Sequence, residues 1–269
     1  MPELPEVEAV VRSLRPKLRG AFLERLRILD DRLLPLPLAA LARRRVRRVE
    51  RRGKNILLGL DAPNRPELWL AVHLRMTGKL VWAGHVADED AGRIRARFEL
   101  DGEDLLFVDT RRFGTIRSAP DREAAGPVGI DPLSPDLSGR RLASLLVGSR
   151  QALKAWLLRQ DRLAGLGNIY ASEILHAARL HPEREAGSLT AAETTRLLRT
   201  TRRILRRAIE AGGTTVSDYR GTRGQPGTFQ VRLKVYGRDG EPCRTCRSGI
   251  VRTVTQGRST FHCPRCQRL

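Results

Sequence analysis

The four cysteines of this 269-residue chain all lie between positions 243 and 266, as two Cys-x2-Cys pairs separated by sixteen residues. Four thiolates at this spacing can close a tetrahedron around zinc. An iron–sulfur cluster is the alternative, but the spacing fits a zinc ribbon better than the ferredoxin patterns. No cysteine remains for a disulfide elsewhere. We therefore predict one structural zinc ion held by Cys243, Cys246, Cys263 and Cys266.

The segment between the two cysteine pairs reads as a β-hairpin. The stretches IVRTVT and RSTFHC are short strands with Gln256-Gly257 at the turn, and Arg258 stands just after the tip. Segment 238–269 carries seven Arg against one Asp and one Glu. A basic hairpin fixed by zinc is suited to holding DNA, although a purely structural clip would use the same cysteines.

The whole chain is strongly basic, with 50 Lys and Arg against 30 Asp and Glu and a formal net charge of +20. A charge of this size attracts polyanions and favours nucleic acid as the partner. A coding bias toward Arg explains the choice of Arg over Lys but not the excess of positive charge. No apolar run is long enough for a membrane span, and the first residues lack a signal-peptide pattern, so we expect a cytoplasmic protein.

Hydrophobic periodicity separates a strand-rich first half from a helical second half. Residues 5–18 have apolar side chains at helical spacing, with Pro16 as a kink or an early stop. Between 22 and 118 the short apolar segments and the Asp101-Gly102 turn indicate a sandwich or barrel. The predicted strands are FLERLRIL, NILLGL, WLAVHLRM, KLVWAG, RARFEL, DLLFVD and FGTIRS.

The second half follows a linker over 119–139, which holds four Pro and three Gly. Helices are predicted over 152–160 and 167–180. A third begins at the capping-box pair Thr190 and Glu193 and ends at Gly212-Gly213. The Gly-rich segment 212–228 is long for a loop without a function of its own.

The opening MPELPEVE indicates an amine nucleophile. Once Met1 is removed, Pro2 presents a secondary amine, which can attack an aldehyde carbon and form an iminium. The positive end of the following helix disfavours the ammonium form of that amine. Glu3 and Glu6 can carry protons beside it. Acidic residues also favour helix N-termini for structural reasons, so this stretch alone leaves both interpretations open.

PELPEVE at the start, GLGNIYASEIL in the middle and the basic four-cysteine hairpin at the end together resemble the bacterial formamidopyrimidine-DNA glycosylases, the 8-oxoguanine repair enzymes. The resemblance covers the whole chain. It implies an α+β fold: an N-terminal helix with a β-sandwich, a helix–two-turns–helix domain and a C-terminal zinc finger β-hairpin. The expected boundaries are 1–130 for the catalytic domain, 131–237 for the DNA-binding domain with its lesion loop, and 238–269 for the zinc finger.

The resemblance implies a monomeric, bifunctional glycosylase and AP lyase acting on double-stranded DNA with oxidised bases or abasic sites. An oxidised purine (8-oxoguanine or a formamidopyrimidine) is flipped out, its glycosidic bond is cut, and the strand is nicked by β,δ-elimination. In this scheme Pro2 is the nucleophile at C1′, Glu3 is the general acid that opens the sugar ring, and Glu6 is a supporting proton carrier.

Two other functions stay open. An endonuclease VIII-like glycosylase would use the same proline chemistry on oxidised pyrimidines, although PELPEVE and TRRFG favour the formamidopyrimidine type. A non-catalytic zinc-ribbon DNA-binding protein would need no proline amine.

The resemblance assigns roles to three polar residues in other motifs. Lys54 in RRGKNILL is a second catalytic base or a phosphate contact; it is one of five Lys, and an ammonium, unlike a guanidinium, can lose its proton. Arg258 is the finger arginine that grips a phosphate and aids the last elimination, or else a solvated turn residue. Asn168 binds phosphate at a helix N-terminus, a role compatible with ordinary capping.

Met76 in HLRMTG, with Arg111 and Phe113 in TRRFG, resembles the family's void-filling trio. Apolar wedges can occupy the space of a flipped base, and Arg111 can pair with the orphaned cytosine. Without the motif, Met76 and Phe113 would read as core residues. Arg112 competes with Arg111 for the pairing role.

Arg150 and Lys154 are expected either as DNA-backbone contacts or as solvated charges. One departure from the family concerns a DNA-contacting histidine, whose place is taken by Gly92. Arg93 or Arg95 substitutes for it, or the contact is lost; His85 lies outside the pattern. The 212–228 loop is expected to close over the flipped base.

Overall fold

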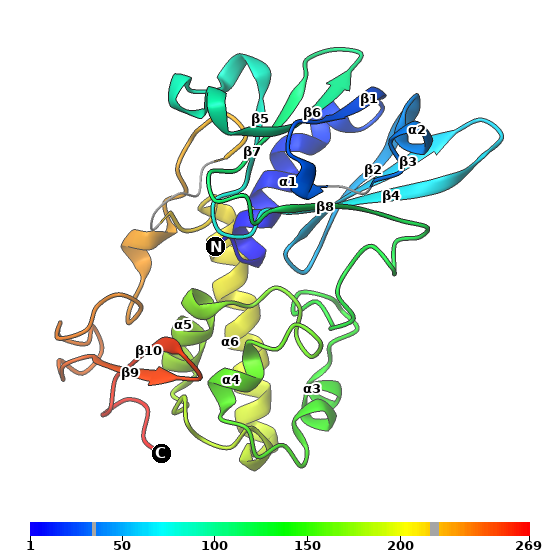
Figure 1. Cartoon of the computed structure of the whole chain (residues 1–269). Helices are drawn as coiled ribbons and strands as arrows, with labels where there is room; N and C mark the ends of the chain where they lie inside the picture. Colours follow the sequence, from blue (N-terminus) through cyan, green and yellow to red (C-terminus); the bar gives the residue numbers. More distant parts are fainter. Residues whose placement is uncertain (34–35, 216–220) are drawn as a thin grey trace. The chain divides into compact units, whose positions relative to one another are not determined.

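The structure is a computed structural model that describes residues 1–33, 36–215 and 221–269 (Figure 1). The chain forms two compact units. Unit 1 comprises Met1–Pro127 and Ile209–Gln230, and unit 2 comprises Val128–Ala208 and Val231–Leu269. Among the described residues, no helix is long and apolar enough to cross a membrane.

Unit 1 begins with helix α1 (Leu4–Leu18), as the apolar spacing predicts. Its apolar stripe is fully buried. Pro5 lies in the first turn, where a missing backbone N–H costs no helical hydrogen bond. The helix continues through Pro16 to Leu18, so the predicted early stop does not occur; one turn from the end, Pro16 removes a single bond.

Eight strands of unit 1 form one antiparallel sheet in the order β5-β7-β6-β1-β2-β3-β4-β8. Strands β1 and β2 share only the pairs Phe22↔Arg45 and Leu23↔Arg44, so the sheet divides into two four-stranded halves. Both halves and α1 contribute side chains to one apolar core, which is the predicted sandwich arrangement. The strands are β1 (Phe22–Ile28), β2 (Arg44–Arg52), β3 (Asn55–Ala62), β4 (Arg65–His73), β5 (Lys79–Trp82), β6 (Ile94–Leu100), β7 (Leu105–Val108) and β8 (Thr115–Ala119).

Strand β2, with the sequence RRVRRVERR, was not predicted. Its register shifts between Val46 and Arg48, so its two buried valines stand three residues apart and break the usual alternation. Arg44 is itself buried and donates to the carbonyls of Ala40 and Pro66, both over 2.6 Å. The short helix α2 (Leu38–Leu41) provides the first of these carbonyls.

Unit 2 holds the predicted helices and hairpin. The predicted linker over 119–139 ends at a helix that was missed, α3, whose N-terminus is capped by the Ser138 hydroxyl accepting from Arg141 N. The capping box of α6 is confirmed, since Thr190 and Glu193 each bond the other's backbone amide. The elements are α3 (Gly139–Leu146), α4 (Leu153–Leu157), α5 (Asn168–Ala178), α6 (Ala191–Glu210, of which the last two residues belong to unit 1), β9 (Val251–Thr255) and β10 (Arg258–His262).

Gln256 and Gly257 join β9 and β10 with φ angles of 47° and 72°, as a two-residue turn with both residues left-handed requires. The zinc finger hairpin predicted from sequence is therefore present, and Arg258 is the first residue after its turn.

Candidate functional site

The first residues of unit 1 form a buried polar cluster at the start of α1. Pro2, Glu3 and Glu6 are all buried, and Glu3 is the N-cap of the helix. The Glu3 amide donates to Oε2 of Glu6 over 2.8 Å, and the Thr214 amide donates to Oε1 of Glu6 over 2.7 Å. Glu6 thus joins the start of the chain to the start of the 212–228 segment.

Gly213 allows this close approach. Its φ is +87°, and a Cβ at this position would lie 2.8 Å from Oε1 of Glu6. The predicted closure of the 212–228 loop over a flipped base falls partly on residues 216–220, which lie outside the described residues.

Lys54 is buried in the turn between β2 and β3. On β4, His73 pairs with Asn55, the neighbour of Lys54. Burial, followed by the charges of Arg75 and Lys54, lowers the pKa of His73 to about 4. Its Nδ1 accepts the Arg75 amide over 3.0 Å. His73 is therefore a neutral imidazole beside the Lys54 region, a feature that the sequence analysis missed.

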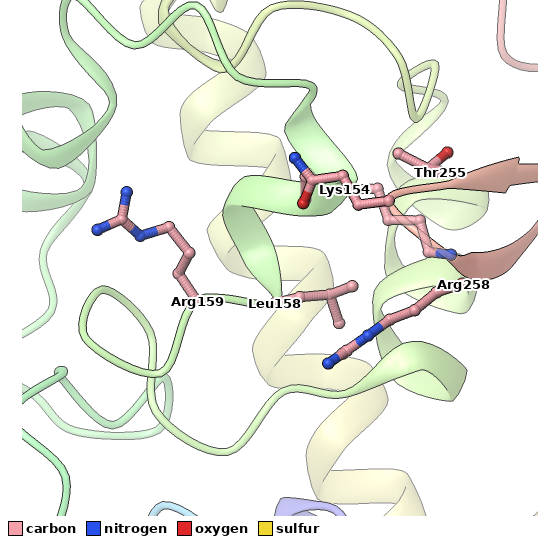
Figure 2. Close-up of a pocket in the computed structure, with 7 residues that line it drawn as sticks. Lys154, Leu158, Arg159, Thr255 and Arg258 are labelled. Atoms are coloured by element: carbon pink, nitrogen blue, oxygen red, sulfur yellow. The ribbon is translucent and has the colours of Figure 1, made fainter.

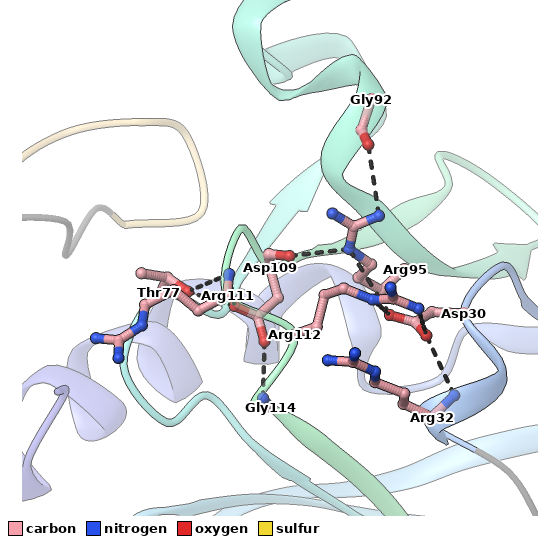
Figure 3. Close-up of polar contacts among 9 residues, drawn as sticks. All are labelled: Asp30, Arg32, Thr77, Gly92, Arg95, Asp109, Arg111, Arg112 and Gly114. Carbon is pink, nitrogen blue, oxygen red and sulfur yellow. Dashed lines mark hydrogen bonds and ion pairs between the residues drawn. The ribbon is translucent and has the colours of Figure 1, made fainter.

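The predicted void-filling residues lie on two loops of unit 1, and Figure 3 shows the hydrogen bond between these loops, from the Arg111 amide to Thr77. Met76 is 41% exposed and Phe113 is 50% exposed, which excludes the alternative that they are core residues. The Arg111 guanidinium carbon lies 4.8 Å from the centre of the Phe113 ring. Thr77, next to Met76, accepts the Arg111 amide over 3.0 Å.

The Asp109 side chain links these two loops by hydrogen bonds. Its buried carboxylate accepts the Thr77 hydroxyl and, over 2.7 Å, the Gly114 amide. A Cβ at Gly114 would lie 2.4 Å from the Phe107 ring, so the loop needs glycine here. The exposed tip between Asp109 and Gly114 is thus fixed at both ends.

Arg112 points away from Arg111 and toward Asp30 (Figure 3). Its Nε donates to Oδ2 of Asp30 over 2.6 Å, and its Nη2 donates to Oδ1. The hydrogen bonds from Arg112 are the main cause that lowers the pKa of Asp30 to about 2. Because the Arg112 guanidinium is engaged here, the geometry favours Arg111 for the pairing role.

Gly92, which stands where the family places a DNA-contacting histidine, is linked to this loop through Arg95. Arg95 donates from Nε to the Asp109 carbonyl over 2.9 Å, so its side chain supports the loop. Arg93 and His85 are both exposed.

In unit 2, Lys154 and Asn168 bind the same backbone atom of the zinc finger. Lys154 is fully buried, and its Nζ donates to the Ser259 carbonyl and to the Thr260 hydroxyl, both over 2.8 Å. Asn168, the first residue of α5, donates from Nδ2 to the same Ser259 carbonyl over 2.9 Å. Lys154 is therefore neither solvated nor exposed, whereas Arg150 is exposed.

Arg258, next to Ser259, is exposed at the start of β10. It lines a basic pocket of about 210 Å³ together with Lys154, Arg159 and Thr255 (Figure 2). Arg159 is paired with Asp161 and the Lys154 ammonium is bound to Ser259 and Thr260, so the exposed Arg258 guanidinium is the group of these three that suits a phosphate oxygen.

The four cysteine sulfurs lie within 4.8 Å of one another. A tetrahedral zinc site with Zn–S bonds of about 2.3 Å has S–S edges of about 3.8 Å. The observed Cys243–Cys266 and Cys246–Cys263 separations, 4.0 and 3.4 Å, lie on either side of that value. Backbone amides of Thr245 and Cys266 approach sulfurs to 3.4 Å, as they do around thiolates. The site fits zinc.

Helix α5 makes two further contacts that the sequence did not reveal, one with the zinc finger and one with the segment just before it. His176 lies with Nε2 3.5 Å from Cys243 Sγ. The buried Glu173 carboxylate accepts the successive amides of Lys234, Val235 and Tyr236 within 3.0 Å. The sequence signal for the second contact is a glutamate within an otherwise apolar helical stretch. This signal does not indicate which residues the glutamate binds.

Three family descriptions match successive parts of the chain. They are the formamidopyrimidine-DNA glycosylase N-terminal domain over residues 1–116, the H2TH domain of the same enzymes over 128–220, and a zinc finger found in FPG and IleRS over 240–269. The chain belongs to the formamidopyrimidine-DNA glycosylase family. As a member it is a DNA glycosylase, and its cofactor is one structural zinc ion.

Individual relatives are similar to this glycosylase over its whole length. It is 44% identical to the formamidopyrimidine-DNA glycosylase of Heliobacterium modesticaldum, with all of both chains covered. The crystal structure of the MutM (Fpg) protein from Thermus thermophilus is 41% identical, has a TM-score of 0.88, and covers 99% of this chain and 98% of its own. A Lactococcus lactis Fpg mutant in complex with Fapy-dG DNA is 30% identical, with a TM-score of 0.88 and full coverage of both chains.

Proposed function

We propose that this glycosylase excises oxidised purines from double-stranded DNA and then cleaves the strand as an AP lyase. The observation that carries the proposal is the buried Pro2–Glu3–Glu6 cluster at the N-terminus of α1. The lactococcal relative, solved with Fapy-dG DNA, supports an oxidised purine as the substrate class.

The chemistry starts at Pro2 after removal of Met1. The neutral secondary amine attacks C1′ of the damaged nucleotide, the C1′–N9 bond breaks, and the base leaves with a proton. Glu3 protonates the ring oxygen O4′ as the sugar opens, which leaves an iminium between Pro2 and C1′. The iminium acidifies C2′, so loss of a C2′ proton expels the 3′ phosphate, and a second elimination expels the 5′ phosphate.

Glu6 and Lys54 support this chemistry from the same unit. Glu6 fixes the amide that follows Pro2 and can carry a proton. Lys54 is buried near His73, whose pKa is lowered to about 4. It serves as a phosphate contact or as a second base.

The exposed trio is proposed to stabilise the distorted duplex. Met76 and Phe113 occupy the space that the flipped base leaves, and Arg111 donates hydrogen bonds to the acceptor edge of the orphaned cytosine. The exposure of Met76 and Phe113 supports this role, because it leaves both apolar side chains free to enter a duplex.

In unit 2, Arg258 is proposed to grip a phosphate and aid the last elimination, with Asn168 and Arg150 as further backbone contacts. Lys154 departs from its predicted role as a DNA contact. Because its ammonium is buried against Ser259 and Thr260, we assign it to positioning Arg258.

We also propose that the enzyme is a monomer that works on the nucleoid in the cytoplasm, where its DNA substrate and reduced thiolates for zinc are available. The proposed division is 1–130 for the catalytic domain, 131–237 for the DNA-binding domain and 238–269 for the zinc finger.

The test is borohydride trapping on an 8-oxoguanine:cytosine duplex, followed by peptide mapping of the adduct. The expected result is a covalent adduct at Pro2, unchanged by Pro5→Ala and lost in Pro2→Leu. An adduct on a lysine would overturn the assignment of Pro2 as the nucleophile. If protein without Met1 gave no adduct, the proposed imine chemistry would be refuted and DNA binding alone would remain supported. A thymine glycol duplex run in parallel tests the pyrimidine-specific alternative.

A further inference from the structure

We propose that Asp30 is a positioning residue that controls how well the enzyme reads the base opposite the lesion. It does so through Arg112, which lies between the two exposed residues Arg111 and Phe113. The inference rests on the proposed function, because it takes Arg111 as the group that meets the orphaned base.

Asp30 is a buried carboxylate just after β1, and its oxygens are surrounded by donors from distant segments. Arg112 binds both oxygens in a two-pronged pair, and the Arg32 amide donates to Oδ1 over 3.1 Å. Two-pronged pairs between a guanidinium and a carboxylate fix direction as well as distance. Asp30 therefore determines where the Arg112 side chain lies.

The backbone conformation of Arg112 links the Asp30–Arg112 pair to the direction of the Arg111 side chain. Arg112 has a φ of +58°, a left-handed conformation that a residue with a Cβ adopts at a cost. In this conformation the side chains of Arg111 and Arg112 diverge, so the first extends outward while the second reaches Asp30 (Figure 3). The pair with Asp30 supplies the interaction that holds this conformation in place.

Arg95 connects Asp30 to the rest of the loop. Its Nε lies 2.9 Å from the Asp109 carbonyl and 3.9 Å from Oδ2 of Asp30. Asp109 in turn accepts the Gly114 amide, where the exposed tip ends, and the hydroxyl of Thr77, which accepts the Arg111 amide. The tip is thus fixed from two sides, by Asp109 at its ends and by Asp30 at its centre.

Without the Asp30 charge, the Arg95 and Arg112 guanidiniums would face each other with no carboxylate between them. Arg112 would turn outward, where it offers DNA a second guanidinium beside Arg111. Two mobile cations attract phosphate and either base without distinction, whereas one fixed guanidinium discriminates by hydrogen-bond geometry. Loss of Asp30 should therefore reduce discrimination between cytosine and adenine opposite the lesion more than it reduces excision itself.

The experiment compares kcat/KM for 8-oxoguanine:cytosine and 8-oxoguanine:adenine duplexes, using the full-length, zinc-loaded protein. The variants are Asp30→Asn, the conservative Asp30→Glu, and the matched control Asp61→Asn, which removes an exposed acid paired with Arg47. We expect Asp30→Asn to lower the cytosine-to-adenine ratio roughly tenfold, as the loss of one charge-assisted contact would. Asp30→Glu should restore part of the ratio, and Asp61→Asn should leave it unchanged.

A folded Asp30→Asn protein with an unchanged ratio, including one in which both rates fall equally, would overturn the inference. If Asp30→Asn does not fold, Arg112→Gln tests the same pair from the other side, and a wild-type ratio in that variant counts equally against it. Wild-type protein that neither excises 8-oxoguanine nor forms a borohydride adduct would instead refute the proposed function.

Discussion

Thr214 donates its backbone N–H to Oε1 of Glu6 over 2.7 Å. The other oxygen of Glu6 accepts the Glu3 amide. One buried carboxylate therefore holds both the start of the chain and the beginning of the 212–228 segment. Because both partners are donors, position 6 needs two acceptor atoms.

Glu6→Gln should place an NH2 group against one of these backbone donors. We expect a loss of about 2 kcal/mol in the free energy of unfolding, the usual size for a hydrogen bond to a charged group. Trapping should slow at least tenfold as Pro2 loses its position. Urea unfolding and single-turnover trapping measure the two effects, with Glu24→Gln, an exposed glutamate on β1, as the control. Normal trapping in a destabilised Glu6→Gln protein would limit Glu6 to a structural role.

Lys154→Met should affect chemistry more than stability. Methionine fills a similar volume, and replacing a buried charge with an apolar side chain is often nearly neutral for folding. The Ser259 and Thr260 contacts disappear, so the neighbouring Arg258 should be less well held. We expect β-elimination products to accumulate relative to β,δ-elimination products on denaturing gels. The exposed Arg140→Met is the control, and an unchanged product ratio would contradict the positioning role.

His176→Phe should speed zinc release. The Nε2 atom lies 3.5 Å from Cys243 Sγ, where an N–H can donate to a thiolate and offset its charge. Removal of such outer contacts typically weakens metal binding about 10- to 100-fold. Release to a chromophoric chelator should be at least several-fold faster than in wild type or in the control His85→Phe. Equal rates in all three proteins would show that the contact does not stabilise the bound metal.

Glu193 should contribute to acid sensitivity. Hydrogen bonds from Arg184 are the largest cause that lowers its pKa from 4.5 to about 2. A carboxylate with a lowered pKa in the folded state gives stability that is complete above pH 4.5 and is lost as the pH falls toward 2. Over that window, unfolding free energy should fall less steeply in Glu193→Gln than in wild type or in the exposed control Glu185→Gln. If unfolding free energy fell equally steeply with pH in all three proteins, the Arg184–Glu193 pair would not contribute to acid sensitivity.

The sequence was most informative where chemistry or local geometry restricts the residue type. The Cys-x2-Cys pairs, the apolar stripe of α1 and the capping box of α6 depend on neighbours within a few positions, and each was predicted. Strand β2 was missed because its bulge hides Val46 and Val49 among arginines.

Long-range polar pairs carried no such signal. Arg112 meets Asp30 across 82 positions, and nothing in either local sequence names the other. Lys154 was expected at a surface because lysine is rarely fully buried. Its partners lie more than 100 positions away, so only the fold reveals why this ammonium is inside.

The Ser259 carbonyl, shared by Lys154 and Asn168, makes the zinc finger a poor candidate for transplantation. This finger, grafted onto another protein, would arrive without the Lys154 amine and the Asn168 amide that orient its tip, even with all four thiolates in place. Correct placement of its tip therefore depends on helices about a hundred residues upstream. Chimeras should recover activity only when α4 and α5 travel with the finger from the same parent.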